Sequence, residues 1–214
     1  MSSIYVINLK RSPERLARIE QQLSKLGNSF TRVDAVDHKT NVDFETLRNT
    51  MRVHIQRGHA GCALSHILLL QSFIRDGNSK YCVVLEDDAE LLRKLPDSES
   101  KISDNIRSIN RDLDILYITP SVSCDDKRRV VAGSGTYGYI ITRKGAAKVL
   151  KICQDLTAPI DLRLITHSPA CDCYKPQYLC PTHPDLKLKS YVCKTPYVVH
   201  NDHGFSYVNQ SNRK

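Results

Sequence analysis

The sequence lacks any long apolar run, internal repeat or low-complexity tract. No apolar stretch approaches the roughly 20 residues that a helix needs to cross a bilayer, so we expect no transmembrane segment. The first strand-like segment begins at Ile4, and no basic region with an apolar core precedes it as in a secretory signal. We therefore expect a cytoplasmic location.

Basic residues are scattered along the chain, although the formal net charge is +8. No helix or strand carries a basic stripe of the kind that binds nucleic acid. The charge favours phosphate-bearing ligands without deciding between a nucleic acid, a membrane surface and an anionic substrate. The eight cysteines are expected to be free thiols, because a reducing compartment disfavours disulfides.

The 214 residues suit one domain, residues 1–214, with its own core. The chain opens with a β–α–β pattern: a strand from Ile4, a helix over 12–27 and a strand over 30–36. Ser12 is a suitable N-cap, Pro13 suits the first helical position and Gly27 suits the end. This order predicts an α/β fold with a mostly parallel central sheet flanked by helices.

Further elements follow the same logic. Apolar periodicity predicts a helix over 59–74 that ends near Gly77, strands over 81–85, 114–118 and 136–142, and a helix over 143–152. Residues 93–111 are polar and are interpreted as a solvated helix or loop. Residues 167–190 are rich in Pro, Cys and His and are interpreted as a long functional or weakly ordered loop.

The strand YCVVL ends abruptly in Glu86-Asp87-Asp88. Ligands of open α/β sheets bind at the carboxyl ends of the strands. Residues two apart on a strand point to the same side, about 6 to 7 Å apart, so Glu86 and Asp88 are predicted to converge on one cation while Asp87 faces away. Carboxylates suit Mg²⁺ or Mn²⁺. The alternative is a solvated acidic turn.

Several segments in fixed order resemble glycosyltransferase family 25, which includes bacterial lipooligosaccharide galactosyltransferases and procollagen galactosyltransferases. They are YVINLKRSPERL, GHAGCALSH, VVLEDDAE, GTYGYIITRKGAAKVL and PID, and they span about Ile4 to Asp161. The resemblance implies a GT-A type fold, a nucleotide-sugar donor, commonly UDP-galactose, and inversion at the anomeric carbon.

The resemblance also implies roles for individual residues. The acidic triplet matches the family's metal motif, with Glu86 and Asp88 as ligands of Mn²⁺ (or Mg²⁺). The remaining matches are the first loop, which contacts the nucleotide, and the positions before the triplet: Asn8, Leu9 and Arg11, then Gly61, Cys62, Ser65 and His66. The segment YVVHNDH departs from the family pattern, which leaves the third metal contact open.

Several residues outside the acidic triplet are candidates for contact with the donor, each with an alternative structural role. Arg11 follows the first strand, where a guanidinium and free backbone N–H groups can meet a diphosphate, whereas Arg15 is more readily explained as part of a solvated helix face. Asp34 is placed to contact uracil or ribose, or else to cap a turn. Cys62 and His66 are donor-pocket candidates, and the alternative for both is packing within a helix.

Inverting transfer needs a base that deprotonates the acceptor hydroxyl. Asp161 is the predicted base, with helix capping as its alternative role, and Asp202 is the reserve candidate. A neutral imidazole after YVV can complete the metal site, and His200 is preferred to His203 for this role. Lone surface histidines are nevertheless common.

A zinc hypothesis attaches to the C-terminal cysteines and histidines, although their spacing does not match a paired C-x-x-C finger. The residues are Cys171, Cys173, Cys180, Cys193, His167 and His183. Free thiols are the preferred interpretation.

The sequence thus predicts metal-dependent transfer of a hexose, galactose or glucose, from a UDP-sugar to an acceptor hydroxyl with inversion. The acceptor is left open among a glycan, a lipid-linked saccharide, a protein and a modified base. The oligomeric state is also left open. The alternative is a non-catalytic module on a degenerate transferase fold that binds nucleic acid or protein, with or without a structural zinc.

Overall fold

A six-stranded sheet in the order β2-β1-β3-β8-β5-β9 forms the centre of the molecule. The computed structural model describes residues 4–96, 98, 100–102, 104, 112–171 and 176–201. The strands are β1 (Ile4–Asn8), β2 (Thr31–Asp34), β3 (Tyr81–Glu86), β5 (Ile115–Tyr117), β8 (Gly138–Thr142) and β9 (Ser190–Val192). Five of them run in one direction and β8 runs opposite, between β3 and β5. The expected α/β class with a mostly parallel sheet is confirmed.

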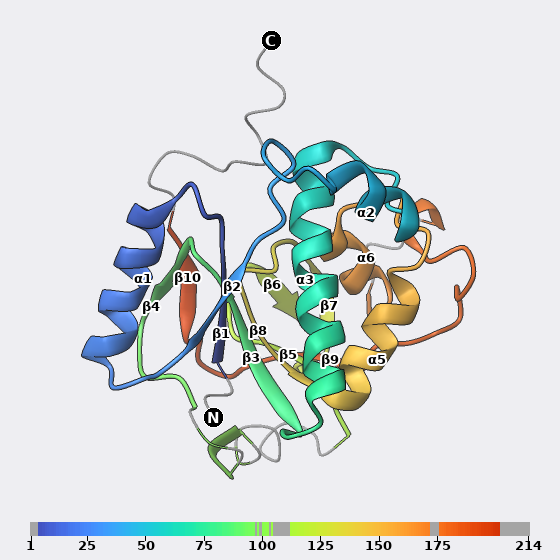
Figure 1. Ribbon diagram of the computed structural model, residues 1–214. Coiled ribbons are helices and arrows are strands. Elements are labelled where there is room, and N and C mark those ends of the chain that lie inside the picture. Colours follow the sequence, from blue (N-terminus) through green and yellow to red (C-terminus); the bar gives the residue numbers. More distant parts are fainter. Residues whose placement is uncertain are drawn as a thin grey trace.

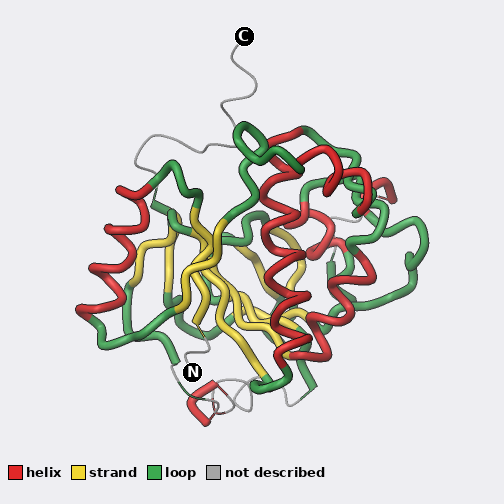
Figure 2. Tube along the Cα trace, in the orientation of Figure 1, coloured by secondary structure: helices red, strands yellow, loops and turns green. Residues whose placement is uncertain are grey.

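Helices cover one face of this sheet, as Figures 1 and 2 show. They are α2 (Phe44–Thr50), α3 (Arg57–Asp76), α5 (Arg143–Ile152) and α6 (Ile160–Thr166). The opposite face carries α1 (Pro13–Lys25) and a small antiparallel sheet of β4 (Ala89–Leu91) and β10 (Val198–His200). The pair β6 (Val122–Cys124) and β7 (Val130–Gly133) and the 3-10 turn η1 (Pro176–Tyr178) complete the fold.

Two apolar cores form because side chains alternate across the strands. In β3, Cys82 and Val84 belong to the core under α3, whereas Val83 and Leu85 belong to the core under α1. Both faces of β3 are therefore covered, which explains the continuous apolar run in the sequence. The same alternation decides which way the polar residues at the strand end point.

The two long helices end as the sequence predicts. Gly27 and Gly77 have φ values of 66° and 70°, a left-handed conformation that glycine adopts without a steric penalty. Pro13 occupies the first position of α1, but the Ser12 side chain makes no capping hydrogen bond, and its hydroxyl is buried without a partner. The Ser12 carbonyl instead accepts a hydrogen bond from the Asn8 side chain at 3.0 Å.

The described parts of the segment 167–190 are anchored to the domain. His167 is fully buried, and its Nδ1 lies 2.6 Å from the Leu186 carbonyl while its Nε2 accepts a hydrogen bond from the Cys180 N–H at 3.0 Å. Cys180 and Cys193 lie in different cores, so the predicted cysteines do not converge on one zinc. Cys173 lies outside the described residues. The seven described cysteines are free thiols.

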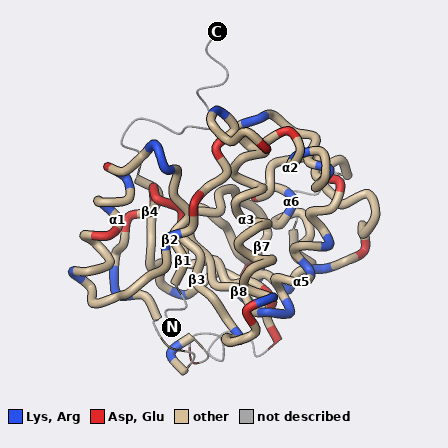
Figure 3. Tube along the Cα trace, in the orientation of Figure 1, with Lys and Arg blue, Asp and Glu red and all other residues tan. Residues whose placement is uncertain are grey.

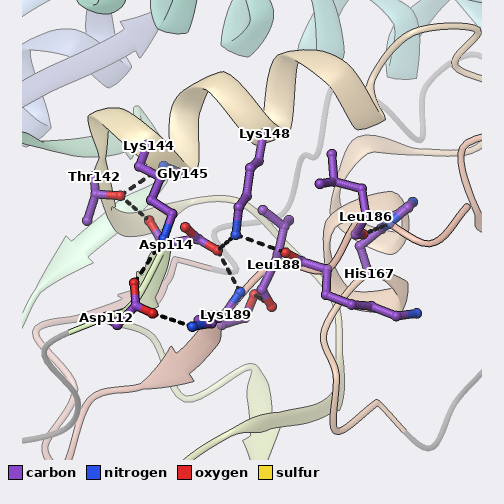
Figure 4. A network of polar contacts seen from close by, with 12 residues as sticks. Asp112, Asp114, Thr142, Lys144, Gly145, Lys148, His167, Leu186, Leu188 and Lys189 are labelled. Carbon is purple, nitrogen blue, oxygen red and sulfur yellow. Dashed lines mark hydrogen bonds and ion pairs between the residues drawn. The ribbon is translucent and has the colours of Figure 1, made fainter. Parts of the chain in front are cut away.

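A buried carboxylate joins α5 to the strands β5 and β9 (Figure 4). Asp114, which has no exposed surface, accepts hydrogen bonds from the Lys148 ammonium and from the Lys189 N–H. The exposed Asp112 pairs with Lys144 at 2.9 Å and also with Lys189. Gly145 permits this approach, since a Cβ there would lie 2.2 Å from the Asp114 carbonyl oxygen.

Basic residues are distributed over both sides of the sheet and over several elements (Figure 3). This agrees with the scatter of Lys and Arg along the sequence. Among the described residues, no helix combines the length and the apolar character that crossing a membrane requires.

Candidate active site

The carboxyl ends of β1 and β3 meet the start of α1 at one edge of the sheet. A cavity of ≈ 120 Å³ opens there between the first loop, the loop after β2 and the first half of α3. Its lining includes residues of all three segments and the acidic triplet: Leu9, Arg11, Arg15, Val36, His38, Gly61, Cys62, Ser65, His66, Glu86, Asp87 and Asp88. Parallel strands end at the same edge, which is why distant parts of the sequence line one cavity.

Asp87 is the buried centre of the triplet. Its Oδ2 accepts a hydrogen bond from the Asn8 amide at 2.8 Å, and its Oδ1 lies 2.9 Å from Arg15 Nη1. Asn8 is itself buried and accepts a hydrogen bond from Arg32 at 3.1 Å. The end of β1 therefore holds the end of β3 through side chains.

Asp88 shares the same arginine and reaches the C-terminal strand. Its Oδ2 lies 3.1 Å from Arg15 Nη2 and 3.6 Å from His200 Nε2. The pairing of β10 with β4, in which His200 is opposite Ala89, brings the histidine there. Asp88 Oδ1 is buried and has no hydrogen-bond partner. His200 thus lies near Asp88, but its role as a metal ligand stays a prediction, and Asp202 and His203 lie outside the described residues.

Glu86 faces the helical side of the sheet. Its Oε1 accepts a hydrogen bond from Thr136 at 2.6 Å and lies 3.2 Å from His66 Nε2, while His66 Nδ1 lies 2.9 Å from the Tyr139 hydroxyl. The prediction that Asp87 faces away from Glu86 and Asp88 was wrong for Asp88. Because β3 ends at Glu86, strand alternation does not extend through the turn, and Asp87 and Asp88 share Arg15.

Burial and pairing act in opposite directions on the two aspartates. Burial raises the pKa of Asp87 to about 6, and the nearby Arg15 charge and the Asn8 hydrogen bond only partly offset it. Burial also raises the pKa of Asp88, but the hydrogen bond from His200 and the Arg15 charge outweigh it and hold that pKa below its ordinary value. The site therefore contains two neighbouring carboxyl groups with different proton affinities.

Arg11 is held over the cavity by Asp37. Arg11 Nε lies 2.5 Å from Asp37 Oδ2, and the Asp37 side chain is almost fully buried. Burial raises the pKa of Asp37, but the hydrogen bonds from the Lys39 N–H and from Arg11 lower it below its ordinary value. Asp34 does not line this cavity. Its exposed side chain pairs with Arg32 at 2.9 Å and Lys10 at 3.9 Å.

Gly61 and Ser65 shape the cavity wall by fixing the loop after β2 against α3. The Ser65 hydroxyl donates to the Gly61 carbonyl at 2.7 Å and accepts from the Val36 N–H at 2.8 Å. A Cβ on Gly61 would lie 2.6 Å from the Val36 carbonyl oxygen, so the close approach requires glycine. Both residues also line the cavity, and their contact with a donor stays a prediction.

A second cavity of ≈ 590 Å³ lies on the other side of the acidic triplet. It shares Cys62, Glu86 and Asp88 with the first cavity, and it is otherwise lined by the segment before β8, the start of α6 and His200. Asp161 lies in its wall, where its Oδ2 accepts a hydrogen bond from the Gly135 N–H at 2.8 Å and its Oδ1 one from the Leu162 N–H at 2.9 Å. The predicted base therefore faces a cavity adjoining the acidic residues.

Sequence reasoning missed Asp37, Thr136, Tyr139 and the pairing role of Arg15. Arg15 was interpreted as part of a solvated face, yet its side chain is only 15% exposed. Arg11 precedes the first residue of α1, Pro13, so helical spacing alone does not place it beside Arg15. Nothing local in the sequence marks Thr136 or Tyr139, which approach Glu86 and His66 only through the folded sheet.

The fold is an α/β fold whose two cavities lie at the carboxyl edge of a mostly parallel sheet. The family model of glycosyltransferase family 25 (LPS biosynthesis protein) matches residues 1–164. The chain belongs to this family. The match includes every cavity residue discussed above except His200, which lies in the C-terminal part of the chain.

Named relatives agree with the family. A putative glycosyltransferase of Haemophilus influenzae is 29% identical over 170 residues, which cover 74% of this chain and 59% of that protein. Procollagen galactosyltransferase 2 of Homo sapiens is 27% identical over 169 residues, covering 69% of this chain and 27% of that protein. The chain thus matches about three fifths and about a quarter of the length of these two relatives.

A crystal structure of a glycosyltransferase involved in the glycosylation of the major capsid of PBCV-1 is similar over 98% of this chain and 96% of that chain. The sequence identity is 11% and the TM-score is 0.45.

Proposed function

We propose that this chain transfers a hexose, galactose or glucose, from a UDP-sugar to an acceptor hydroxyl with inversion at the anomeric carbon, assisted by Mn²⁺ or Mg²⁺. The observation that carries the proposal is the pair of cavities that meet at Glu86 and Asp88. One cavity contains two arginines, and the other contains a carboxylate fixed by backbone N–H groups. Family membership supports the same reaction class.

The cavity with the arginines suits the donor. Arg11 and Arg15 line it at the start of α1, and the first loop supplies Leu9. A diphosphate placed there meets guanidinium groups close to the N-terminus of a helix, where backbone N–H groups also favour negative charge. Asp37 keeps Arg11 in place. Asp34, which was considered for contact with uracil or ribose, does not line this cavity.

The acidic residues suit a hard divalent cation. Asp88 presents a buried oxygen, Oδ1, that has no hydrogen-bond partner, and such an atom is costly unless a ligand satisfies it. Asp88 and His200, 3.6 Å apart, would hold the cation, and Glu86 would have to turn from His66 and Thr136 to join them. A bound cation would neutralise charge on the departing diphosphate.

Asp161 is proposed to remove the proton from the acceptor. The acceptor hydroxyl, held in the larger cavity, gives its proton to the Asp161 carboxylate while its oxygen forms a bond to the anomeric carbon. The bond from that carbon to the UDP oxygen breaks at the same time, and UDP departs toward Arg11 and Arg15. Attack from the cavity opposite the leaving group inverts the anomeric centre.

Calorimetric titration of UDP with and without Mn²⁺ tests the donor assignment, and a hydrolysis screen over several nucleotide sugars tests the sugar. UDP binding that strengthens with Mn²⁺, together with release of one hexose, is the expected result. The proposal would be overturned if UDP does not bind under either condition while DNA binds in a salt-sensitive manner, because that result favours a non-catalytic nucleic-acid module. Acceptors are then compared among glycans, lipid-linked saccharides, proteins and modified bases.

A further inference from the structure

A thiol, an imidazole and a carboxylate converge at the wall between the two cavities. The ligand atoms of Cys62, His66 and Glu86 lie within 4.8 Å of one another. Cys62 and His66 are four residues apart on α3 and so lie on one face of the helix, while Glu86 ends β3. Cys62 and Glu86 line both cavities, so solvent and ions can reach the cluster from either side.

We propose that Cys62 Sγ, His66 Nε2 and the Glu86 carboxylate form a binding site for a thiophilic divalent cation, Zn²⁺ above all. Sulfur, nitrogen and oxygen donors of this kind are the ligands that Zn²⁺ takes in proteins. Three protein ligands leave a fourth position open toward the cavities, where water or an anionic oxygen can bind. The proposal does not depend on glycosyl transfer.

The distances fit a tetrahedral ion. His66 Nε2 and Glu86 Oε1 are 3.2 Å apart. Two such ligands, each about 2.0 to 2.1 Å from Zn²⁺, then subtend roughly 100° at the metal, close to a tetrahedral angle. A thiolate about 2.3 Å from the ion would lie roughly 3.6 Å from the His66 nitrogen and from the Glu86 oxygen. The Cys62 sulfur now lies within 4.8 Å of both atoms, so it has to move toward them by roughly 1.2 Å at most.

The surrounding hydrogen bonds are those that zinc ligands usually have. The Tyr139 hydroxyl lies 2.9 Å from His66 Nδ1 and can accept a hydrogen bond from Nδ1–H, and in that tautomer the Nε2 lone pair is available to the metal. Thr136 donates to Glu86 Oε1 at 2.6 Å and orients the carboxylate. His66 and Tyr139 are both almost completely buried, so these orientations are fixed by packing.

Binding replaces protons by metal. The Cys62 S–H bond breaks and its proton goes to solvent as the sulfur–zinc bond forms, and no electron transfer is involved. The ion takes the place of the hydrogen-bond contact between His66 Nε2 and Glu86.

The thiolate separates this site from the set proposed around Asp88, which consists of carboxylate oxygens and the His200 imidazole. A thiolate favours Zn²⁺ over Mg²⁺ and Mn²⁺, which prefer carboxylate and phosphate oxygens. Because Glu86 belongs to both sets, an ion bound to Cys62 and His66 engages the carboxylate that the other set needs.

Co²⁺ provides a spectroscopic probe that requires no knowledge of the substrate. The full chain titrated with Co²⁺ is expected to show a sulfur-to-cobalt charge-transfer band that Zn²⁺ abolishes by competition. Cys62→Ser should remove the band and weaken Zn²⁺ binding on the order of 100-fold. Cys124→Ser is the matched control: Cys124 is also a half-buried free thiol, but it lies outside the cluster, so its loss should leave the band unchanged.

A measurement on the unaltered protein guards against a misfolded variant. Zn²⁺ is expected to slow alkylation of Cys62, mapped by mass spectrometry, without slowing that of Cys124. Absence of the cobalt band in the wild type, persistence of the band in Cys62→Ser, or equal alkylation of Cys62 with and without Zn²⁺ would overturn the proposal.

Discussion

Arg15 Nη1 lies 2.9 Å from Asp87 Oδ1, in an ion pair whose side chains are only 15% and 7% exposed. The same guanidinium reaches Asp88 at 3.1 Å. The Arg15 guanidinium therefore forms ion pairs with two buried carboxyl groups. Burial raises the pKa of Asp87 in spite of this arginine, whereas Arg15 and His200 together hold the pKa of Asp88 below its ordinary value. Burying the ionised form of Asp87 therefore lowers the free energy of unfolding, a cost that depends on pH.

The first prediction concerns that cost. The pKa of Asp87 rises from 3.8 to about 6 on folding, so the folded protein binds the proton more tightly than the unfolded chain. The resulting stabilisation is complete below the unfolded pKa and is lost as pH rises through about 6. The loss between pH 4 and pH 7.5 is up to about 3 kcal/mol, at about 1.4 kcal/mol per pH unit.

Asp87→Asn should remove most of this pH dependence, because the amide does not titrate and can still accept the hydrogen bond from Asn8. Urea unfolding between pH 4 and pH 7.5 measures it. Asp34→Asn, an exposed change outside both cavities, is the control and should keep the wild-type slope. An unchanged slope in Asp87→Asn would show that another group carries the pH dependence.

The second prediction concerns the proposed binding of Mn²⁺ at Asp88. Asp88→Asn should abolish the strengthening of UDP binding by Mn²⁺, because it replaces the carboxylate whose Oδ1 has no hydrogen-bond partner. The fold should persist, since Asp88 lies in a turn at the end of β3. Glu90→Gln, an exposed change two residues further along in β4, is the matched control and should preserve the Mn²⁺ effect. Full Mn²⁺ dependence in Asp88→Asn would remove this residue from the metal set.

The elements that the sequence predicts are the long and periodic ones. The β–α–β opening, the helix that ends at Gly77 and the helix over 143–152 all match the structure. The missed elements are short: the strands β4, β6, β7, β9 and β10 have three or four residues each and the helices α2 and α6 have seven, too few for a period to emerge. Their pairing comes from tertiary contacts, such as that of β10 with β4.

The candidate site was predictable in position but less so in its contacts. A buried strand that ends in three acidic residues identifies the sheet edge where the cavity lies. The partners of those residues come from the helix start, the second half of the sheet and the C-terminal strand, and no local pattern encodes such distances. Asp37 illustrates this limit: it lies three residues after Asp34 in the same turn region, and only the fold decides which of the two reaches Arg11.

The third prediction tests the network of ion pairs and hydrogen bonds around the buried Asp114, which directly precedes β5. Asp114→Ala should lower the free energy of unfolding by about 3 to 5 kcal/mol, because Lys148 and the Lys189 N–H lose a fully buried partner. Asp112→Ala removes an exposed carboxylate from the same network and should cost far less stability, because solvent screens its ion pairs. Denaturant unfolding of both variants makes the comparison. Equal losses would mean that burial does not govern the strength of this network.

The last prediction separates proton transfer from structure at Asp161. If this carboxylate is the base, Asp161→Asn should lower kcat by a factor on the order of 10² or more and leave UDP affinity nearly unchanged, because the donor cavity does not include Asp161. A structural loss should accompany it. The carboxylate accepts hydrogen bonds from the Gly135 and Leu162 N–H groups with different oxygens, and asparagine can keep only one, which costs roughly 1 kcal/mol.

Steady-state kinetics with donor and acceptor saturating, paired with a thermal melt, distinguish these effects. Asp155→Asn is the control: it weakens a buried carboxylate's ion pair with Arg52 and lies outside both cavities, so it should change stability without changing kcat. Asparagine also tolerates the positive φ of 52° at that position. A normal kcat in folded Asp161→Asn would remove Asp161 from proton transfer and leave it a structural role, in which it accepts the hydrogen bonds from the Gly135 and Leu162 N–H groups.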